Sequence, residues 1–183
     1  MMEVEKSKLT GGLIFTPKVF HDERGSFFET WNERELKRLG LDVKFVQDNH
    51  SRSLKGTLRG LHYQIKDSQG KLVRVSAGEV FDVSVDIRTS SKTFGQWEGV
   101  VLSAKNNKQV WIPPGFAHGF LVLSEVAEFQ YKCTNFYNSA AERCIRWDDP
   151  SLAIDWPTGS LEKVILSKQD QLGRSLTEAE VFP

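Results

Sequence analysis

Two histidines stand in settings where proton chemistry is possible. His62 lies within Arg59–Gln64, which has the pattern of a strand. His118 follows the turn-forming residues Pro113–Gly115 and lies inside an aromatic run. Imidazole takes up and releases protons near neutral pH, so either residue can serve as an acid or a base. Taken alone, His62 is explained more simply as a hydrogen-bonded structural residue, whereas for His118 the structural and functional interpretations are evenly balanced.

Lys71 and Tyr131 are two further residues whose types suit such chemistry. Lys71 begins a strand-like run, and an ammonium that points inward stabilises negative charge on an oxygen. Tyr131 shares a strand face with Phe129 and Cys133, because side chains alternate with a period of two. In isolation, a solvent-exposed lysine and a core tyrosine are the simpler interpretations.

Two segments combine aromatic and polar residues in a way that suits a nucleotide. They are His21–Glu29, which contains Arg24, and Phe45–Ser51. A base can stack on the aromatic rings while the guanidinium contacts a phosphate. Surface turns have the same composition, so each segment alone is a weak indication.

The elements that must position these residues are mainly short strands. Val73–Ala77 and Asp82–Ile87 alternate apolar and polar residues, which predicts half-buried strands. Further strands are expected at Gln96–Ser103, Val110–Ile112, Phe116–Leu123 and Ala127–Thr134. Short strands separated by Gly, Pro and Asn predict an all-β, antiparallel sandwich or barrel.

Helix signals are scarce outside one segment. Glu33–Leu39 is predicted to be a short helix, with Asn32 as its N-cap, Glu35 at the capping-box position and Gly40 after its end. The ends of the chain, at about residues 1–30 and 140–183, lack such patterns. We expect them to be irregular and to wrap around the barrel.

Composition limits the class of protein. The chain has 183 residues, 39% hydrophobic and 26% charged, which fits one domain over residues 1–183. Its 24 basic and 24 acidic residues balance, so a broad nucleic-acid or membrane surface is not indicated. Two cysteines, Cys133 and Cys144, do not suggest a disulfide framework. No signal peptide or membrane-spanning run is recognised, so we expect a cytoplasmic protein.

Seven motifs in order give the polar clusters a common interpretation. Together they closely resemble the dTDP-4-dehydrorhamnose 3,5-epimerase family of cupin-like enzymes, from about Phe15 to Asp170. The resemblance implies a cupin-type jelly-roll fold, a homodimer and a dTDP-linked 6-deoxy-4-ketohexose substrate, inverted at C3 and C5 during L-rhamnose synthesis. The motifs are Arg24–Glu29, Gln47–Ser51, Arg59–Gln64, Pro113–Phe120, Tyr131–Thr134, Trp147–Pro150 and Ile154–Pro157.

The same resemblance implies a role for individual residues. His62 matches the general base, Tyr131 the proton donor and Asp170 the carboxylate that pairs with the histidine. Lys71 matches the residue beside the keto oxygen, where it would stabilise an enolate. The remaining nucleotide and sugar contacts are expected at Arg24, Glu29, Gln47, Asn49, Arg59, His118, Glu142 and Lys168.

Neither a metal nor a cofactor is expected. Many cupins bind a metal through a His-x-His pair, but the second position here is Gln64, and the positive charge of Lys71 is expected nearby. The sequence contains no dinucleotide-binding or Walker A motif, and epimerisation beside a ketone requires no redox cofactor.

Three other functions fit part of the pattern. They are a mono-epimerase acting on a related dTDP-keto sugar, a non-catalytic cupin that binds a sugar nucleotide, and a metal-dependent cupin enzyme. One local conflict also remains: strict alternation puts Arg59 and His62 on opposite faces of one strand. A β-bulge at Gly60 would resolve it, as would an arginine that reaches the pyrophosphate around an edge.

Overall fold

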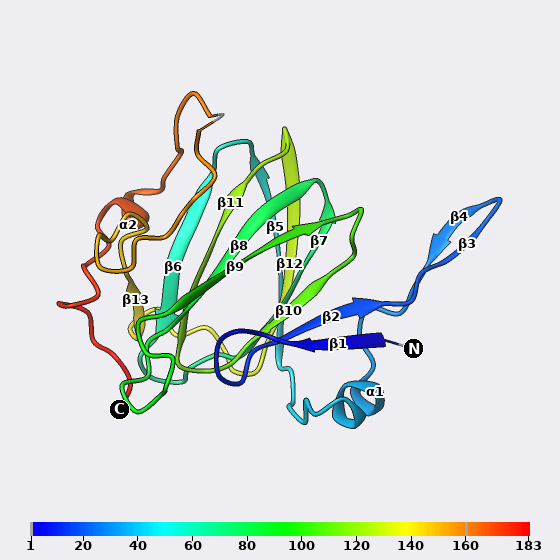
Figure 1. Ribbon diagram of the computed structural model, residues 1–183, viewed down its shortest axis with the longest axis horizontal. Helices are drawn as coiled ribbons and strands as arrows, with labels where there is room; N and C mark the ends of the chain where they lie inside the picture. The colour runs from blue at the N-terminus through cyan, green and yellow to red at the C-terminus, as the bar shows by residue number, and fades with distance from the viewer. Residues whose placement is uncertain (1, 160) are drawn as a thin grey trace.

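The computed structural model describes residues 2–159 and 161–183 and shows two antiparallel sheets packed face to face (Figure 1). The six-stranded sheet has the order β1 (Met2–Lys6), β2 (Leu13–Pro17), β10 (Gln109–Ile112), β7 (Lys71–Ala77), β12 (Val126–Cys133) and β5 (Gln47–Leu54). The five-stranded sheet has the order β13 (Glu142–Cys144), β6 (Leu58–Gln64), β11 (Phe116–Val122), β8 (Glu79–Asp86) and β9 (Trp97–Ser103). The antiparallel sandwich predicted from the sequence is therefore confirmed.

Three apolar clusters hold the sandwich together. The first lies between the sheets and contains Val73 and Phe129 from one sheet and Phe120 from the other. The second covers the outer face of the five-stranded sheet with the C-terminal segment, including Trp156. The third covers the outer face of the six-stranded sheet with residues around α1 (Glu33–Arg38). The outer face of the five-stranded sheet and the β1–β2–β10–β7 part of the six-stranded sheet are thus covered, which removes apolar surface from water.

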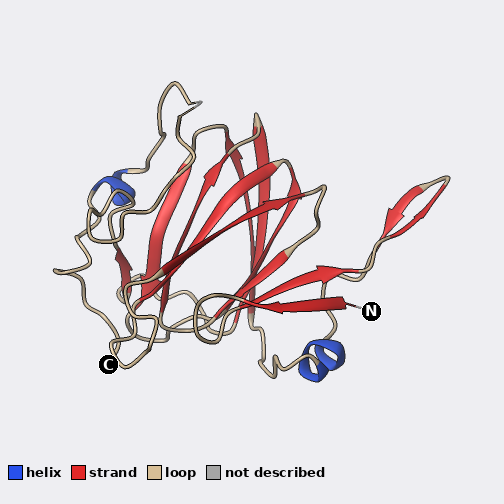
Figure 2. Cartoon of the chain, viewed as in Figure 1, coloured by secondary structure: helices blue, strands red, loops and turns tan. Residues whose placement is uncertain are grey.

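The N-terminal segment differs from the expected irregular chain. It contains β1 and β2, which extend the six-stranded sheet, and a separate hairpin of β3 (Phe20–Asp22) and β4 (Gly25–Phe27). Figure 2 shows this hairpin projecting away from the sandwich. The C-terminal segment is largely irregular as expected, apart from β13 and a second short helix, α2 (Lys168–Gln171).

Helix α1 forms where the sequence predicted it. The Asn32 side chain accepts a hydrogen bond from the Glu35 backbone N–H, which satisfies one free donor at the helix start. The Glu35 carboxylate does not complete the capping box in this structure, because it pairs with Arg38 instead.

Strand β8 is more buried than its alternating pattern predicted. Its polar residues Asp82, Ser84 and Asp86 are buried as well as its valines. Val83 and Val85 pack in the outer cluster, so the polar side chains, which alternate with them, face the space between the sheets. A polar strand face is tolerated there because its groups find partners; Asp82, for example, contacts His118.

A register shift in β6 resolves the conflict between Arg59 and His62. His118 on β11 lies opposite His62, while Phe120 lies opposite Arg59, so two steps along β11 match three along β6. Leu61 packs in the outer cluster, which leaves both Arg59 and His62 on the inner face. The bulge at Gly60 is one of the two solutions expected from the sequence, and it places both side chains inside.

Candidate active site

The inner face of β6 brings His62 against a carboxylate from the far end of the chain. Its Nε2 atom lies 2.7 Å from Oδ1 of Asp170 in α2. Asp170 is almost fully buried, whereas His62 keeps 28% of its side chain exposed. The predicted histidine–carboxylate pair is thus formed in the structure, with the imidazole on the accessible side.

Helix α2 holds Asp170 in place through its own cap. The Ser167 hydroxyl accepts from the Asp170 N–H, and the Ser167 backbone N–H donates to Oδ2 of Asp170, which together form a capping box. The Ser167 hydroxyl also donates to Oδ2 at 2.6 Å. The Gly60 N–H donates to Oδ1 at 3.1 Å. Burial acts to raise the pKa of Asp170, but the contacts from His62, Ser167 and Gly60 outweigh it and bring that pKa to about 2. Asp170 is therefore an anion at neutral pH.

Lys71 enters the same space from the opposite sheet. It begins β7, and its Nζ lies 5.9 Å from the centre of the Tyr131 ring. Burial lowers the pKa of Lys71, while the neighbouring Cys133, Asp82 and Glu142 act to raise it. At this partly buried position, an ammonium interacts more strongly with a negative oxygen beside it than it would in bulk water.

His118 forms a second, deeper histidine–carboxylate pair. Its Nε2 lies 2.8 Å from Oδ2 of Asp82, and its ring stacks on Phe129. Burial lowers the pKa of His118, Asp82 acts to raise it, and the charges of Lys71 and His62 lower it further. These mutual effects place His118 in the same polar space as the lysine and the first histidine.

Tyr131 faces this space from β12. Burial, reinforced by Cys133 and Glu142 and opposed by Arg59, raises the pKa of Tyr131 to about 12. The phenol is therefore protonated at neutral pH and can donate a proton. Because β12 and β6 belong to different sheets, Tyr131 and His62 approach the enclosed space from opposite sides.

The predicted contacts on β5, β6 and β13 surround the same space. Gln47 donates to Asn49, whose amide contacts the Cys133 sulfur. Arg59 donates from Nε to Ser53 at 3.1 Å, so its guanidinium lies on the inner face. Glu142 is close enough to Lys71 and Tyr131 to influence their pKa values. Lys168, at the start of α2, lines a surface cavity of about 430 Å³ together with Glu142.

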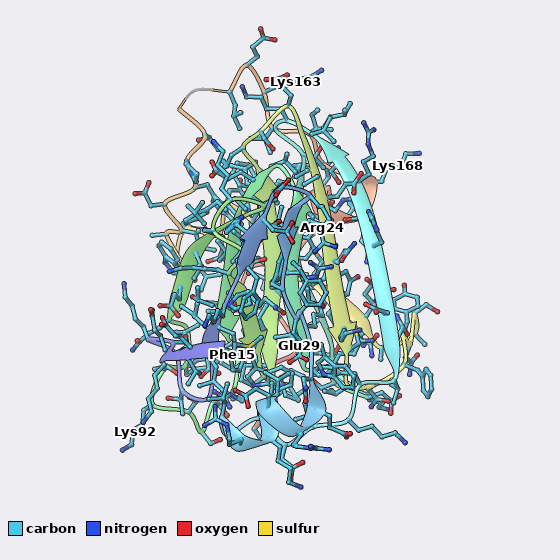
Figure 3. The ribbon with its side chains drawn as sticks, turned by 90° about the vertical axis from the view of Figure 1, so that its right-hand side faces the viewer. Phe15, Arg24, Glu29, Lys92, Lys163 and Lys168 are labelled. Carbon is cyan, nitrogen blue, oxygen red and sulfur yellow. The ribbon has the colours of Figure 1, made fainter. Side chains whose placement is uncertain are left out.

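Arg24 and Glu29 are predicted contacts that the chain holds away from this space. Arg24 lies at the tip of the β3–β4 hairpin, paired with Asp22, and its side chain is 90% exposed. Figure 1 places the hairpin at the opposite end of the molecule from α2. Figure 3 views the molecule from the hairpin side, with Arg24 and Glu29 labelled there and Lys168 near the margin. Glu29 lines a separate cavity of about 480 Å³ at the base of the hairpin.

Sequence reasoning did not single out two residues of the site. Asp82 was read as one polar position in an alternating strand, and only the fold shows that this face points inward. Tyr137 lies outside the seven motifs; its hydroxyl donates to Glu142 at 2.7 Å, and its backbone N–H donates to Gln47. The one sequence signal available for Asp82 is a carboxylate within a predicted strand, which needs a partner such as a histidine if that face is buried.

Comparisons with known proteins fit this arrangement closely. A sequence profile described as dTDP-4-dehydrorhamnose 3,5-epimerase matches residues 6–178. A curated protein of that name from Pseudomonas aeruginosa is 54% identical over 183 residues, which is 100% of both chains.

The chain belongs to the dTDP-4-dehydrorhamnose 3,5-epimerase family.

Solved structures of this epimerase family agree with the fold. A dTDP-6-deoxy-D-glucose-3,5-epimerase from Legionella pneumophila, in complex with dTDP-4-keto-L-rhamnose, has a TM-score of 0.95 and 52% identity, covering 98% of this chain and 95% of that one. A 3′-monoepimerase from Streptomyces bikiniensis, in complex with dTDP-quinovose, has a TM-score of 0.87 and 32% identity, covering 93% and 86%. The cupin-like jelly roll and the epimerase family expected from the motifs are confirmed. In the part of the chain that is described, no helix is long and apolar enough to cross a membrane.

Proposed function

We propose that the protein converts dTDP-4-dehydro-6-deoxy-D-glucose to dTDP-4-dehydro-L-rhamnose by inverting C3 and C5. The observation that carries this proposal is the placement of His62 and Tyr131. Each projects from a different sheet into one polar space that also contains Lys71. Inversion needs a base on one side of a carbon and an acid on the other, and this arrangement supplies both.

His62 is the proposed base. Hydrogens beside the C4 ketone are acidic once the resulting enolate is stabilised. In the observed ring orientation Nε2 contacts Asp170, so Nδ1 accepts the proton from the sugar. The Asp170 anion fixes the ring and stabilises the imidazolium that forms, as a carboxylate does in other histidine–aspartate pairs.

Lys71 and Tyr131 complete the proposed reaction. The Lys71 ammonium faces the enolate oxygen, where a preset charge in a dry site is a large catalytic factor. Tyr131 then delivers its phenolic proton to the opposite face of the carbon, and its high pKa keeps that proton available. C3 and C5 both flank the ketone, so one base serves both after a small shift of the sugar.

We also propose that the active unit is a cytoplasmic homodimer in which the β3–β4 hairpin of one copy reaches the other copy's site. The hairpin exposes Phe20 at 53% and Phe27 at 75%, an apolar surface that a lone chain leaves in water. Its tip carries Arg24, one of the predicted substrate contacts, away from the site of its own chain. A reducing compartment suits the free thiols Cys133 and Cys144.

The test of the activity is proton NMR of dTDP-4-keto-6-deoxyglucose incubated with the protein in deuterated water. Deuterium at both C3 and C5, with formation of the L-sugar, is the expected result. Deuterium at one carbon only would replace the proposal with a mono-epimerase. No exchange with this or related keto sugars, despite nucleotide binding, would favour the non-catalytic alternative.

A further inference from the structure

One buried side chain beside the proposed base takes no part in the proposed reaction. Gln64 is 5% exposed and lies two residues after His62 on β6, so the two share a strand face. Its amide NH2 group donates to the backbone carbonyls of Asp67 at 2.9 Å and Phe136 at 3.2 Å. Its amide oxygen accepts from the Asn138 N–H at 3.0 Å. Both donor hydrogens are engaged with backbone, so Gln64 holds the chain in place and has no donor left for a ligand.

Residues 134–138, at the start of the connection between β12 and β13, contain two of the three groups that Gln64 contacts. Gln69 donates to another carbonyl of this segment at 2.9 Å, and Gln47 accepts from the Tyr137 N–H at 2.9 Å. No residue of this fully described segment belongs to a helix or strand, so side chains supply most partners of its backbone groups. Three glutamine side chains from separate parts of the chain thus fix one short segment.

The segment places Tyr137 beside the candidate active site. Its hydroxyl donates to Glu142, a predicted substrate contact, at 2.7 Å. Tyr137 and Glu142 both act to raise the pKa of Tyr131, so they lie within electrostatic range of the proposed proton donor. Tyr137 is 56% exposed, which puts it at the opening of the site instead of in the core. Its position there depends on backbone that Gln64 holds.

We propose that Gln64 is a positioning residue for ligand binding, which acts by holding Tyr137 at the opening of the site. The proposed catalytic groups His62, Lys71 and Tyr131 do not depend on this segment, because each lies on a strand of one of the two sheets. Loss of the Gln64 amide should therefore weaken binding and leave the chemical step nearly unchanged. The inference rests on the proposed function, which names a dTDP-linked sugar as the ligand.

Calorimetric titration of dTDP into the full chain tests the binding role without any reaction. Gln64→Ala should raise the Kd by about tenfold. Gln64→Glu should weaken binding similarly, because it keeps an acceptor for the Asn138 N–H but turns a carboxylate oxygen toward the Asp67 and Phe136 carbonyls. A wild-type Kd in either folded variant would overturn the proposal.

Asn106→Ala is the matched control for the loss of an amide that holds a loop. The Asn106 side chain also makes three hydrogen bonds to backbone, to Val101, Ser103 and Lys108, all within its own turn. This variant should bind dTDP as the wild type does. Equal weakening in Asn106→Ala and Gln64→Ala would mean that general loosening of the fold, and not the position of Tyr137, sets the affinity.

A double-variant cycle asks whether Gln64 acts through Tyr137. Tyr137→Ala removes the ring that the segment presents, so adding Gln64→Ala to it should change the Kd for dTDP little further. If the two substitutions instead weaken binding by fully independent factors, Gln64 does not act through Tyr137 and the proposal fails.

Steady-state kinetics separates this inference from the proposed function. With the keto-sugar nucleotide, Gln64→Ala should raise KM by about tenfold and keep kcat within about twofold of wild type. A lower kcat at unchanged KM would overturn the positioning role, because Gln64 would then support the chemical step. Absence of epimerisation in the wild type, with the dTDP affinities ordered as expected, would refute the epimerase proposal alone.

Discussion

His62 and His118 both contact a carboxylate, yet their environments assign them different tasks. His118 is 7% exposed, and burial lowers its pKa, which keeps it neutral and confined at neutral pH. His62 is 28% exposed, and its partner Asp170 lies behind it. The deeper histidine is therefore suited to holding a hydrogen bond in place, and the accessible one to exchanging protons with a substrate.

His62→Ala is expected to reduce exchange of the sugar protons with solvent by about 10²- to 10⁴-fold, because a positioned general base contributes that much. The measurement is deuterium incorporation at C3 and C5. His50→Ala is the matched control, because His50 lies at the exposed surface beside Glu128. Wild-type exchange in the His62 variant would remove it as the base.

Tyr131→Phe is expected to impair inversion more than the first proton abstraction, since it removes only the proton donor. The ratio of deuterium exchange to L-sugar formation measures this separation. Tyr63→Phe is the control, because the Tyr63 hydroxyl donates to the Glu180 backbone outside the site. Equal loss of exchange and inversion in Tyr131→Phe would contradict its role as donor.

Lys71 predicts opposite responses of stability and activity to alkaline pH. Folding lowers the pKa of Lys71 from its ordinary value of 10.5. Between the folded and the ordinary pKa, the unfolded chain therefore binds more protons than the folded chain. The free energy of unfolding should rise with pH over this range. Activity should fall over the same range, because the enolate loses its ammonium partner. Denaturation of wild type relative to Lys71→Met, together with the pH dependence of kcat, tests both. A stability difference that falls as pH rises would show that the sign is wrong.

Helix α2 is only four residues long, yet it connects the His62–Asp170 pair to the acid stability of the protein. The pKa of Asp170 is about 2 in the folded chain, against 3.8 for the free side chain. Its lowered pKa stabilises the fold by about 2 kcal/mol above pH 4, and this contribution is lost as pH falls toward 2.

Asp170→Asn is therefore expected to show a shallower loss of stability between pH 4 and pH 2 than wild type. Urea denaturation at a series of pH values measures the slope. Ser167→Ala keeps the charged carboxylate but removes its cap, and should cost about 1 kcal/mol. The same acid dependence in wild type and Asp170→Asn would mean that the carboxylate is not stabilised as its contacts indicate.

The strands show which parts of the fold the sequence could predict. The residues of β7 alternate between apolar and polar because Val73 and Val75 face the core, so the period-two pattern predicted this strand. Strand β5 was missed because Gln47 and Asn49 line the site while Asp48 and His50 face outward, so both faces are polar. Asp82 was missed for a related reason: an alternating pattern gives two faces but does not say which one lies inside.

The site itself was predicted through the family resemblance rather than through any single strand pattern. His62, Lys71 and Tyr131 are separated in sequence and meet because two sheets face each other, and α2 brings Asp170 to His62. The bulge at Gly60 was one of two open solutions, because strand alternation alone cannot locate an extra residue.

The arrangement of the whole chain leads to a prediction about two copies. Arg24→Ala is expected to raise KM by weakening a substrate contact, although Arg24 lies far from His62 in the same chain. If sites are shared, mixing and re-associating His62→Ala and Arg24→Ala chains should regain activity. Each mixed dimer then contains one site with both groups intact.

Sedimentation and activity measured on the same mixture give the decisive comparison. Mixed dimers without regained activity would mean that each site is built from one chain. Lys92 is exposed and lies away from Arg24 (Figure 3). A mixture of Lys92→Ala and His62→Ala chains therefore serves as the control for re-association.

The cap of α2 also determines when, during synthesis of the chain, the His62–Asp170 pair can form. The Gly60 N–H and the Asp170 carboxylate that accepts it are 110 residues apart. A nascent chain that lacks α2 can still pair many of its strands, but its His62 has no Asp170 carboxylate beside it. Because the ribosome adds Asp170 long after His62, a growing chain carries an imidazole without its anion and acquires the pair only after α2 has been synthesised.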